Sequence, residues 1–164
     1  MKISKKNLTV ILVLFFITCV YFLFRLPNLT LQPIFADEAI YIRWAQIMKS
    51  EPTLRFLPLS DGKTPLFMWM MMPVFKIFED PLFAGRILSV GFGYLTLLGL
   101  LALGWRFINK NVGIIAAFLY AITPMIVFFD RMALVDCALA SFSVWCLIFA
   151  LTILERQRVD LAMM

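Results

Sequence analysis

The stretch ILSVGFGYLTLLGLLALGW, residues 87–105, contains no charged residue and is long enough to cross the hydrocarbon core of a bilayer as one helix. Similar apolar stretches lie on both sides of it, over residues 7–26, 112–129 and 132–154. None of them alternates polar and apolar residues as a membrane β-strand does. The sequence therefore predicts about four transmembrane helices.

The composition of the whole chain points to the same surroundings. The 164 residues are 63% hydrophobic and only 15% charged, with a mean hydropathy of +0.93, whereas soluble domains carry about 25% charged residues. In lipid every backbone N–H and C=O must pair within the protein, so only helices and closed barrels can span. We therefore expect an all-α integral membrane protein in which residues 1–164 form one membrane region.

Basic residues flank the predicted spans and indicate their orientation. They gather at the N-terminus, between the second and third spans and after the fourth, at Lys2, Lys5, Lys6, Arg106, Lys110, Arg156 and Arg158. Basic loops usually stay on the cytoplasmic side of a membrane, so the pattern predicts a cytoplasmic N-terminus. The net charge of +5 comes from scattered residues. We interpret it as anchoring, and we expect no nucleic-acid partner.

Residues 27–84 form a long connection of different character. Residues 38–49 are predicted to form an amphipathic helix at the membrane interface, with Ile40 and Trp44 on its apolar face. Residues 65–78 are apolar but too short to cross, which favours an interfacial or re-entrant helix. If they do not cross, this large first loop faces outward, opposite the basic loops.

The residue inventory excludes several chemistries. Histidine is absent, which removes Ser-His-Asp catalysis and histidine-ligated zinc. Cys19, Cys137 and Cys146 are odd in number and lack CxxC spacing, so neither a disulfide framework nor a cysteine metal site is expected. Acid–base work is left to Asp, Glu, Lys and Tyr side chains.

Asp37 and Glu38 are adjacent carboxylates at the start of the amphipathic helix. One interpretation makes them a general base, a group that orients an acceptor hydroxyl, or ligands of a divalent cation. The other makes Asp37 the helix cap and Glu38 a partner of the positive end of the helix dipole. The two interpretations are compatible, because a capping carboxylate keeps a second oxygen.

Three more charged residues are predicted on the outer face. Lys63 follows a turn and can meet an anionic headgroup, or simply extend its ammonium to the interface. Asp136 lies about one turn inside the predicted fourth span, where ionisable residues usually face a polar cavity. Arg131 precedes it and can pair with Asp136 or with a phosphate.

The order of these motifs resembles a known family. The motifs are Asp37-Glu38 after the first span, Gly62-Lys-Thr-Pro-Leu-Phe67 in the same loop, Arg86-Ile-Leu-Ser-Val90 at the second span and Arg131-Met-Ala-Leu-Val-Asp136 at the fourth. They resemble the N-terminal region of GT-C glycosyltransferases, in the group of the dolichyl-phosphate-mannose–protein mannosyltransferases and lipid A aminoarabinose transferases. The resemblance covers about residues 8–154.

The resemblance implies a partial GT-C fold and sugar transfer, with inversion, from a polyprenyl-phosphate-sugar donor to a protein, lipid or glycan acceptor. It implies that the reaction takes place at the extracytoplasmic face of the plasma membrane. By position, Asp37 and Glu38 are then the catalytic residues. Lys63, Arg131 and Asp136 are then the residues that bind the donor phosphate.

The chain departs from its relatives in two respects. Thr64 replaces the first proline of their Gly-Lys-Pro-Pro motif, which alters the rigidity of the loop but keeps the lysine. Relatives also have many more spans and a C-terminal soluble part, which supply much of the donor tunnel and the acceptor site. We therefore interpret the 164 residues as the front part of something longer and expect them to be inactive alone.

Two other functions stay open. A short chain with these residues suits a non-catalytic protein that binds lipid phosphate or acts as a scaffold. Asp136 at a membrane edge suits a small transporter, although the sequence lacks the paired broken helices and internal repeats typical of one. Membrane lipids are partners in every case.

Overall fold

The computed structural model describes residues 5–156 and the side chains of residues 8–155. Within this range the chain is helical and has no strand, which confirms the all-α prediction. The elements are α1 (Lys5–Arg25), α2 (Ala36–Ser50), the short 3-10 helices η1 (Pro52–Leu54) and η2 (Leu57–Asp61), α3 (Leu66–Val74), α4 (Pro81–Phe107), α5 (Lys110–Ile122), α6 (Pro124–Asp130) and α7 (Val135–Arg156). The predicted anchors at Lys2 and Arg158 lie outside the described residues, as do the side chains of Lys5, Lys6 and Arg156.

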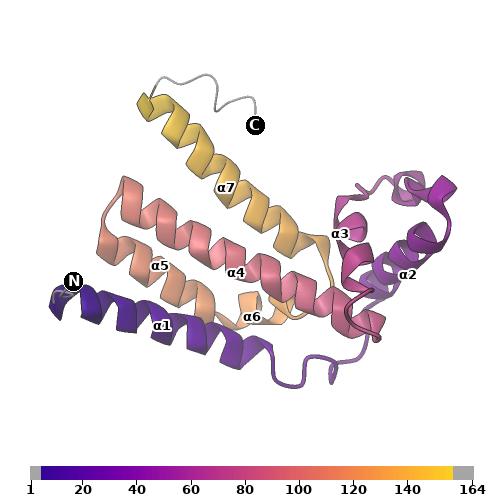
Figure 1. Cartoon of the computed structure of the whole chain (residues 1–164), viewed down its shortest axis with the longest axis horizontal. Coiled ribbons are helices and arrows are strands. Elements are labelled where there is room, and N and C mark those ends of the chain that lie inside the picture. The colour runs from indigo at the N-terminus through magenta and orange to yellow at the C-terminus, as the bar shows by residue number, and fades with distance from the viewer. Residues whose placement is uncertain (1–4, 157–164) are drawn as a thin grey trace.

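The long helices form a bundle with the short helices gathered at one end (Figure 1). α1, α4 and α5 run side by side, and α7 crosses α4 at an angle. α2, α3 and α6 lie at the end where α4 and α7 begin. The start of α1, the α4–α5 connection and the far end of α7 lie at the other end, where Arg106 Nη2 is 3.2 Å from Glu155 Oε2. The candidate residues of the predicted outer face therefore share one end of the bundle.

Within residues 5–156, three helices are long and apolar enough to cross a membrane. They are α1 over Leu8–Arg25, the whole of α4, and α7 over Val135–Glu155. A fourth crossing requires α5 and α6 together, and these two helices are bent by 67° at their junction. The chain is thus a membrane protein with three or four candidate spans, in agreement with the expected number.

The predicted third span is not a continuous helix. Residues 112–129 fall on α5 and α6, which are separated by Thr123. Pro124 begins α6 and has no N–H to donate to the preceding turn, so the helix breaks there. The apolar stretch predicted as one span is therefore a broken pair of helices.

Two span boundaries also differ from the prediction. α4 is longer than residues 87–105, because Asp80 caps it early by accepting a hydrogen bond from the Leu82 N–H. α7 begins at Val135 and not at residue 132. Asp136 consequently lies in the first turn of α7, so its predicted depth inside a span was wrong.

α2 packs against α3 and the start of α4. The buried face of α2 agrees only in part with the apolar face that the sequence predicted. The buried residues of α2 are Glu38, Tyr41, Ile42, Ala45 and Met48. The last four of these share one apolar cluster with Phe67, Met68 and Met71 of α3. Ile40, predicted on the apolar face, is exposed. The packing of α2 against α3 and α4 decided which stripe of this weakly amphipathic helix faces inward.

Candidate functional site

Asp37 and Lys63 come together at the end of the bundle that holds the short helices. Asp37 Oδ1 lies 3.9 Å from Lys63 Nζ, and both side chains are partly exposed. Asp37 is in the first turn of α2, and Lys63 follows Gly62, whose positive φ of 68° ends η2 in a left-handed turn that glycine adopts without strain. Two residues predicted for the site thus form a carboxylate–ammonium pair open to solvent.

Tyr41 supports this pair and was not predicted as a site residue. Its hydroxyl accepts a hydrogen bond from Lys63 Nζ at 3.1 Å, and the ammonium lies 4.8 Å from the centre of its ring. The hydrogen bond from Lys63 to Tyr41, reinforced by the nearby Asp37 carboxylate, raises the pKa of Lys63, so this lysine stays charged. The spacing of four residues from Asp37 to Tyr41, which places both on one helical face, was the signal available in the sequence.

Glu38 is buried and fully engaged, although the sequence grouped it with Asp37. Its Oε2 is 2.8 Å from Arg86 Nη2 and accepts from the Phe35 N–H at 3.0 Å. Its Oε1 accepts from Arg86 Nε at 2.9 Å and from the Ala133 N–H at 2.7 Å. Glu38 therefore joins α2, α4 and the connection before α7, and it has no oxygen facing solvent.

The ionised form of Glu38 is the one that these contacts favour. Burial alone would raise the pKa of its carboxyl group. The hydrogen bonds from Arg86 and from the N–H groups of Ala133 and Phe35 outweigh burial and hold the pKa below its usual value. Arg86 in turn donates to the carbonyls of Leu29 and Gln32, so it also secures the segment between α1 and α2.

The structure also corrects the alternative interpretation of the helix start. The N-cap of α2 is Phe35, and Asp37 is already the second helical residue and makes no capping hydrogen bond. Glu38 satisfies the backbone N–H of the cap residue instead. Asp37 therefore does not have the capping role that the sequence left open for it.

Arg131 is held by backbone carbonyls. Its Nη1 donates to the Phe24 carbonyl at 2.9 Å, and its Nη2 donates to the carbonyls of Pro27 and Asn28, both at 3.0 Å. These carbonyls lie at and just beyond the C-terminal end of α1. Arg131 thus ties the α6–α7 connection to the end of α1, and it makes no ion pair with Asp136.

Asp136 borders a cavity of about 350 Å³ between α5, α6 and α7. Its walls are mostly apolar and include Met125, Ile126 and Phe129, with Asp130 and Tyr120 as polar members. The Asp136 side chain is exposed, and no hydrogen bond to it is found among the described residues. The carboxylate is therefore available at the mouth of an apolar hollow.

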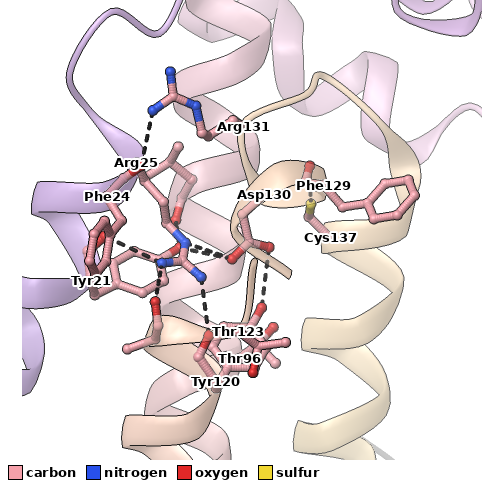
Figure 2. A network of polar contacts seen from close by, with 12 residues as sticks. Tyr21, Phe24, Arg25, Thr96, Tyr120, Thr123, Phe129, Asp130, Arg131 and Cys137 are labelled. Atoms are coloured by element: carbon pink, nitrogen blue, oxygen red, sulfur yellow. Dashed lines mark hydrogen bonds and ion pairs between the residues drawn. The ribbon is translucent and has the colours of Figure 1, made fainter. Parts of the chain in front are cut away.

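Asp130, which also lines this cavity, forms a second buried ion pair with Arg25 (Figure 2). Arg25 Nε is 2.8 Å from Asp130 Oδ2, and both side chains are almost fully buried. Tyr120 donates to Asp130 Oδ1 at 3.2 Å. Gly93 of α4 makes room, since an added Cβ there would lie 2.5 Å from Asp130 Oδ2.

The same arginine stabilises the break between α5 and α6. Arg25 Nη1 donates to the Ala121 carbonyl at 2.9 Å, and Nη2 donates to the Tyr120 carbonyl at 3.2 Å. The Tyr120 carbonyl has no helical partner because Pro124, four positions on, has no N–H. The Ala121 carbonyl has none because α5 ends at Ile122. The network in Figure 2 therefore holds a bend within apolar surroundings, where unpaired carbonyls are costly.

The contacts of these residues limit where a divalent cation could bind. No group of three His, Cys, Asp or Glu side chains suited to a metal ion occurs in the part of the chain that the structure describes. Glu38 offers no free oxygen, since both oxygens accept from Arg86 and from backbone N–H groups. Of the two carboxylates considered for a cation, Asp37 alone is open to solvent.

Comparison with protein families decides the class of the chain. A family model described as dolichyl-phosphate-mannose-protein mannosyltransferase matches residues 62–164, which is more than half of the sequence. The chain belongs to this family. It is therefore a membrane glycosyltransferase of the GT-C type, as the sequence motifs indicated. Comparisons with curated proteins and with solved structures gave no match.

The family match covers the candidate residues unevenly. It includes Lys63, Arg131 and Asp136, and it begins after Asp37 and Glu38. The contact between Asp37 and Lys63 joins the matched and unmatched parts of this glycosyltransferase. Geometry thus supports the grouping of the N-terminal carboxylate with the family region.

Proposed function

We propose that this mannosyltransferase-family protein transfers a sugar from a polyprenyl-phosphate-sugar donor to an acceptor hydroxyl at the extracytoplasmic face of the plasma membrane. The observation that carries the proposal is the open pair of Asp37 and Lys63, 3.9 Å apart at the end of the bundle. Such a transfer needs a general base at the acceptor hydroxyl and a cation at the donor phosphate. Because these two groups act on opposite faces of the anomeric carbon, the sugar enters between Asp37 and Lys63 in this proposal and separates them.

Asp37 acts as the base in this proposal. Its carboxylate accepts the proton of the acceptor hydroxyl while the hydroxyl oxygen forms a bond to the anomeric carbon. The bond from that carbon to the donor phosphate breaks, and its electron pair leaves with the phosphate oxygen as polyprenyl phosphate. Attack from the side opposite the leaving group inverts the anomeric configuration.

Lys63 neutralises the leaving group. A phosphate carries its negative charge throughout the reaction and gains more as the bond breaks, so a fixed cation lowers the barrier. Tyr41 holds the ammonium through its hydroxyl and ring. The lipid tail stays in the bilayer, which keeps the phosphate at the interfacial end of the bundle.

The remaining candidates take supporting roles. Glu38 and Arg131 are engaged by protein groups, so we propose that they position α2 and the α6–α7 connection and do not contact the donor. Asp136 is exposed at the cavity mouth. A carboxylate repels a phosphate, so we propose that it meets hydroxyl groups of the donor sugar.

The proposed orientation follows from charge. The start of α1 and the α4–α5 connection lie at one end of the bundle (Figure 1). The helices α2, which holds Asp37, and α3, which begins soon after Lys63, lie at the other end. The positive-inside rule places the basic end in the cytoplasm. The reacting pair would then face the extracytoplasmic side.

Sugar transfer in the complete natural gene product tests the proposal. A polyprenyl-phosphate-mannose donor is supplied to membranes containing wild type, Asp37→Asn, Lys63→Ala or the control Arg43→Gln. Arg43 is exposed on the same helix as Asp37 and outside the pair. We expect turnover to fall at least about a hundredfold in Asp37→Asn and in Lys63→Ala, which is the usual effect of removing one general base or one charge-stabilising contact. We expect no change in Arg43→Gln.

Two results would count against the proposal. Full turnover in both site variants would remove Asp37 and Lys63 from the reaction. Donor binding without turnover in every protein, wild type included, would support a non-catalytic lipid-phosphate-binding protein instead.

A further inference from the structure

A hollow of about 280 Å³ opens near the C-terminal ends of α2 and α3. Three cationic residues line it, namely Lys49 of α2, Arg55 after η1 and Lys76 after α3, and Met72 and Pro73 complete the wall. No carboxylate is among these lining residues. Three separate segments thus bring positive charge to one concave site.

Arg55 is fixed in place and still has bonding capacity. Its backbone carbonyl accepts from Trp69 Nε1 at 2.7 Å, and its Nη1 lies 3.8 Å from Met72 Sδ, a weak acceptor. Its Nε is buried and has no hydrogen-bond partner. A buried donor without a partner is costly, so the guanidinium is poised for an additional acceptor.

The two lysines also have hydrogen-bond donors for which the described residues supply no acceptor. Lys49 Nζ makes one hydrogen bond, to the Phe75 carbonyl at 3.3 Å, and an ammonium has three donors. Lys76 is exposed. None of the ion pairs found among residues 8–155 involves Lys49, Arg55 or Lys76, although Glu79 and Lys49 line a neighbouring hollow.

Helix dipoles account for only part of this arrangement. A lysine near the C-terminal end of a helix is favourable by itself, which suits Lys49 and Lys76. The dipoles do not account for three like charges in one hollow, since their mutual repulsion opposes folding. A bound anion would remove that repulsion and satisfy the open donors.

The surroundings of the hollow select the kind of anion. Next to the cationic residues in sequence, Leu54, Phe56 and Ile77 expose 43%, 59% and 73% of their surface. Large exposed apolar side chains beside basic residues are typical of protein surfaces that insert into the headgroup region of a bilayer. We propose that Lys49, Arg55 and Lys76 bind the phosphate of an anionic membrane lipid and so seat α2 and α3 on the membrane.

This lipid site is separate from the proposed donor site. Lys49 follows Asp37 by twelve positions on the same helix, which is about 18 Å at 1.5 Å per residue. An anion at the hollow would therefore not touch Asp37 or Lys63. The inference goes beyond the proposed function and stands without it.

Lipid binding to the purified chain tests the proposal. Native mass spectrometry counts phosphatidylglycerol or phosphatidylcholine molecules retained from mixed micelles. The variants are Lys76→Gln, the triple variant Lys49→Gln/Arg55→Gln/Lys76→Gln, and the matched control Arg43→Gln. We expect tighter retention of phosphatidylglycerol than of phosphatidylcholine by wild type. Each lost charge should weaken phosphatidylglycerol binding about fivefold, and the triple variant roughly a hundredfold.

The control variant distinguishes a specific site from general attraction between a basic surface and an anionic lipid. Arg43→Gln removes the same charge from α2 outside the hollow, so it should change binding less than twofold. Equal loss in Arg43→Gln and Lys76→Gln would show a general surface effect and overturn the site. Equal retention of the two lipids by wild type would show that the site does not select an anionic headgroup. Displacement of the lipid by glycerol 3-phosphate would show that the site takes a soluble phosphate, and either result would overturn the choice of an anionic lipid.

The Lys76→Gln variant keeps the test decisive if the triple variant does not fold. Lys76 is exposed and lies beyond the end of α3, so its loss should leave the circular dichroism spectrum unchanged. Wild-type phosphatidylglycerol binding by a folded Lys76→Gln would remove this residue from the site and overturn the three-residue proposal.

Discussion

Glu38 of α2 and Arg86 of α4 form a buried ion pair, with Oε2 and Nη2 2.8 Å apart and neither side chain exposed. Asp37, the next residue to Glu38 in the sequence, instead lies beside Lys63. Burying two charges is costly, and it is tolerated here because further hydrogen bonds satisfy the polar atoms of the pair. The ion pair therefore holds the start of α2 in place.

Breaking this pair should destabilise the protein strongly. Glu38→Gln leaves Arg86 buried without a counter-ion, and we expect a loss of roughly 3–5 kcal/mol in the free energy of unfolding. Denaturant unfolding in detergent micelles measures it. Glu51→Gln, at the exposed end of α2, is the control and should differ from wild type by less than about 0.5 kcal/mol. A Glu38→Gln protein as stable as wild type would show that the pair adds nothing.

The stability of the protein should fall in acid through Glu38. Its pKa in the folded state lies below the usual 4.5. The folded form therefore favours the ionised carboxylate more than the unfolded form does. The stabilisation is complete above about pH 4.5 and is lost as the pH falls through the folded pKa. Thermal unfolding from about pH 7 to pH 3 measures this loss. The difference in stability between wild type and Glu38→Gln at each pH isolates the contribution of Glu38. A difference that did not change with pH would contradict the assignment.

Gly93→Ala should be much less tolerated than Gly91→Ala on the same helix. The added methyl at position 93 would collide with Asp130 and Tyr21, whereas at position 91 it meets nothing within 4 Å. We expect a loss of about 1–3 kcal/mol for Gly93→Ala and no loss for Gly91→Ala, because alanine favours helices. Melting temperatures of the two variants in the same micelles make the comparison, and equal values would contradict the close packing at Gly93.

Tyr41→Phe should weaken donor binding more than turnover. The change removes the acceptor of the Lys63 hydrogen bond and keeps the buried ring. A rise of roughly fivefold in the donor KM is expected for the loss of one partly exposed hydrogen bond. Transfer assays on the complete gene product measure KM and kcat separately, and the melting temperature serves as a folding control. A drop in kcat with an unchanged KM would instead assign Tyr41 to the chemical step.

Ser60→Cys and Ile108→Cys should react from opposite sides of the membrane. Both positions are exposed. Position 60 lies in η2, just before α3, and position 108 lies in the α4–α5 connection, at the opposite end of the bundle from α3. Both cysteines are introduced into a chain whose three native cysteines are replaced by alanine. A maleimide that cannot cross the membrane should label position 60 in intact cells and position 108 only after lysis. Labelling of both in intact cells would overturn the proposed topology.

Much of the architecture was predictable because it depends on local composition. Long apolar stretches near residues 7–26 and 87–105 must become helices in lipid, since no other structure there pairs its own backbone. The short outer helices were predictable from length and polarity. The pairing of Asp37 with Lys63 could be expected only through family resemblance, because 26 positions of loop and helix separate them.

The main contacts that the sequence did not predict join distant segments. Glu38 meets Arg86 from 48 positions away, and Arg25 meets Asp130 from 105. Neither separation leaves a periodic pattern in the sequence. The break at Pro124 was visible as a proline, but its tolerance depends on Arg25, which supplies donors to the freed carbonyls.

The sequence by itself determined that this protein is a helical membrane protein, and its motifs indicated the family, because hydropathy and motif order are properties of the chain alone. The tertiary structure alone decided which charged residues are free to react. Asp37, Lys63 and Asp136 remain partly or fully exposed, while Glu38 and Arg131 are taken up by protein partners. The physical reason is that a buried charge needs partners on every side, and only folding brings those partners together.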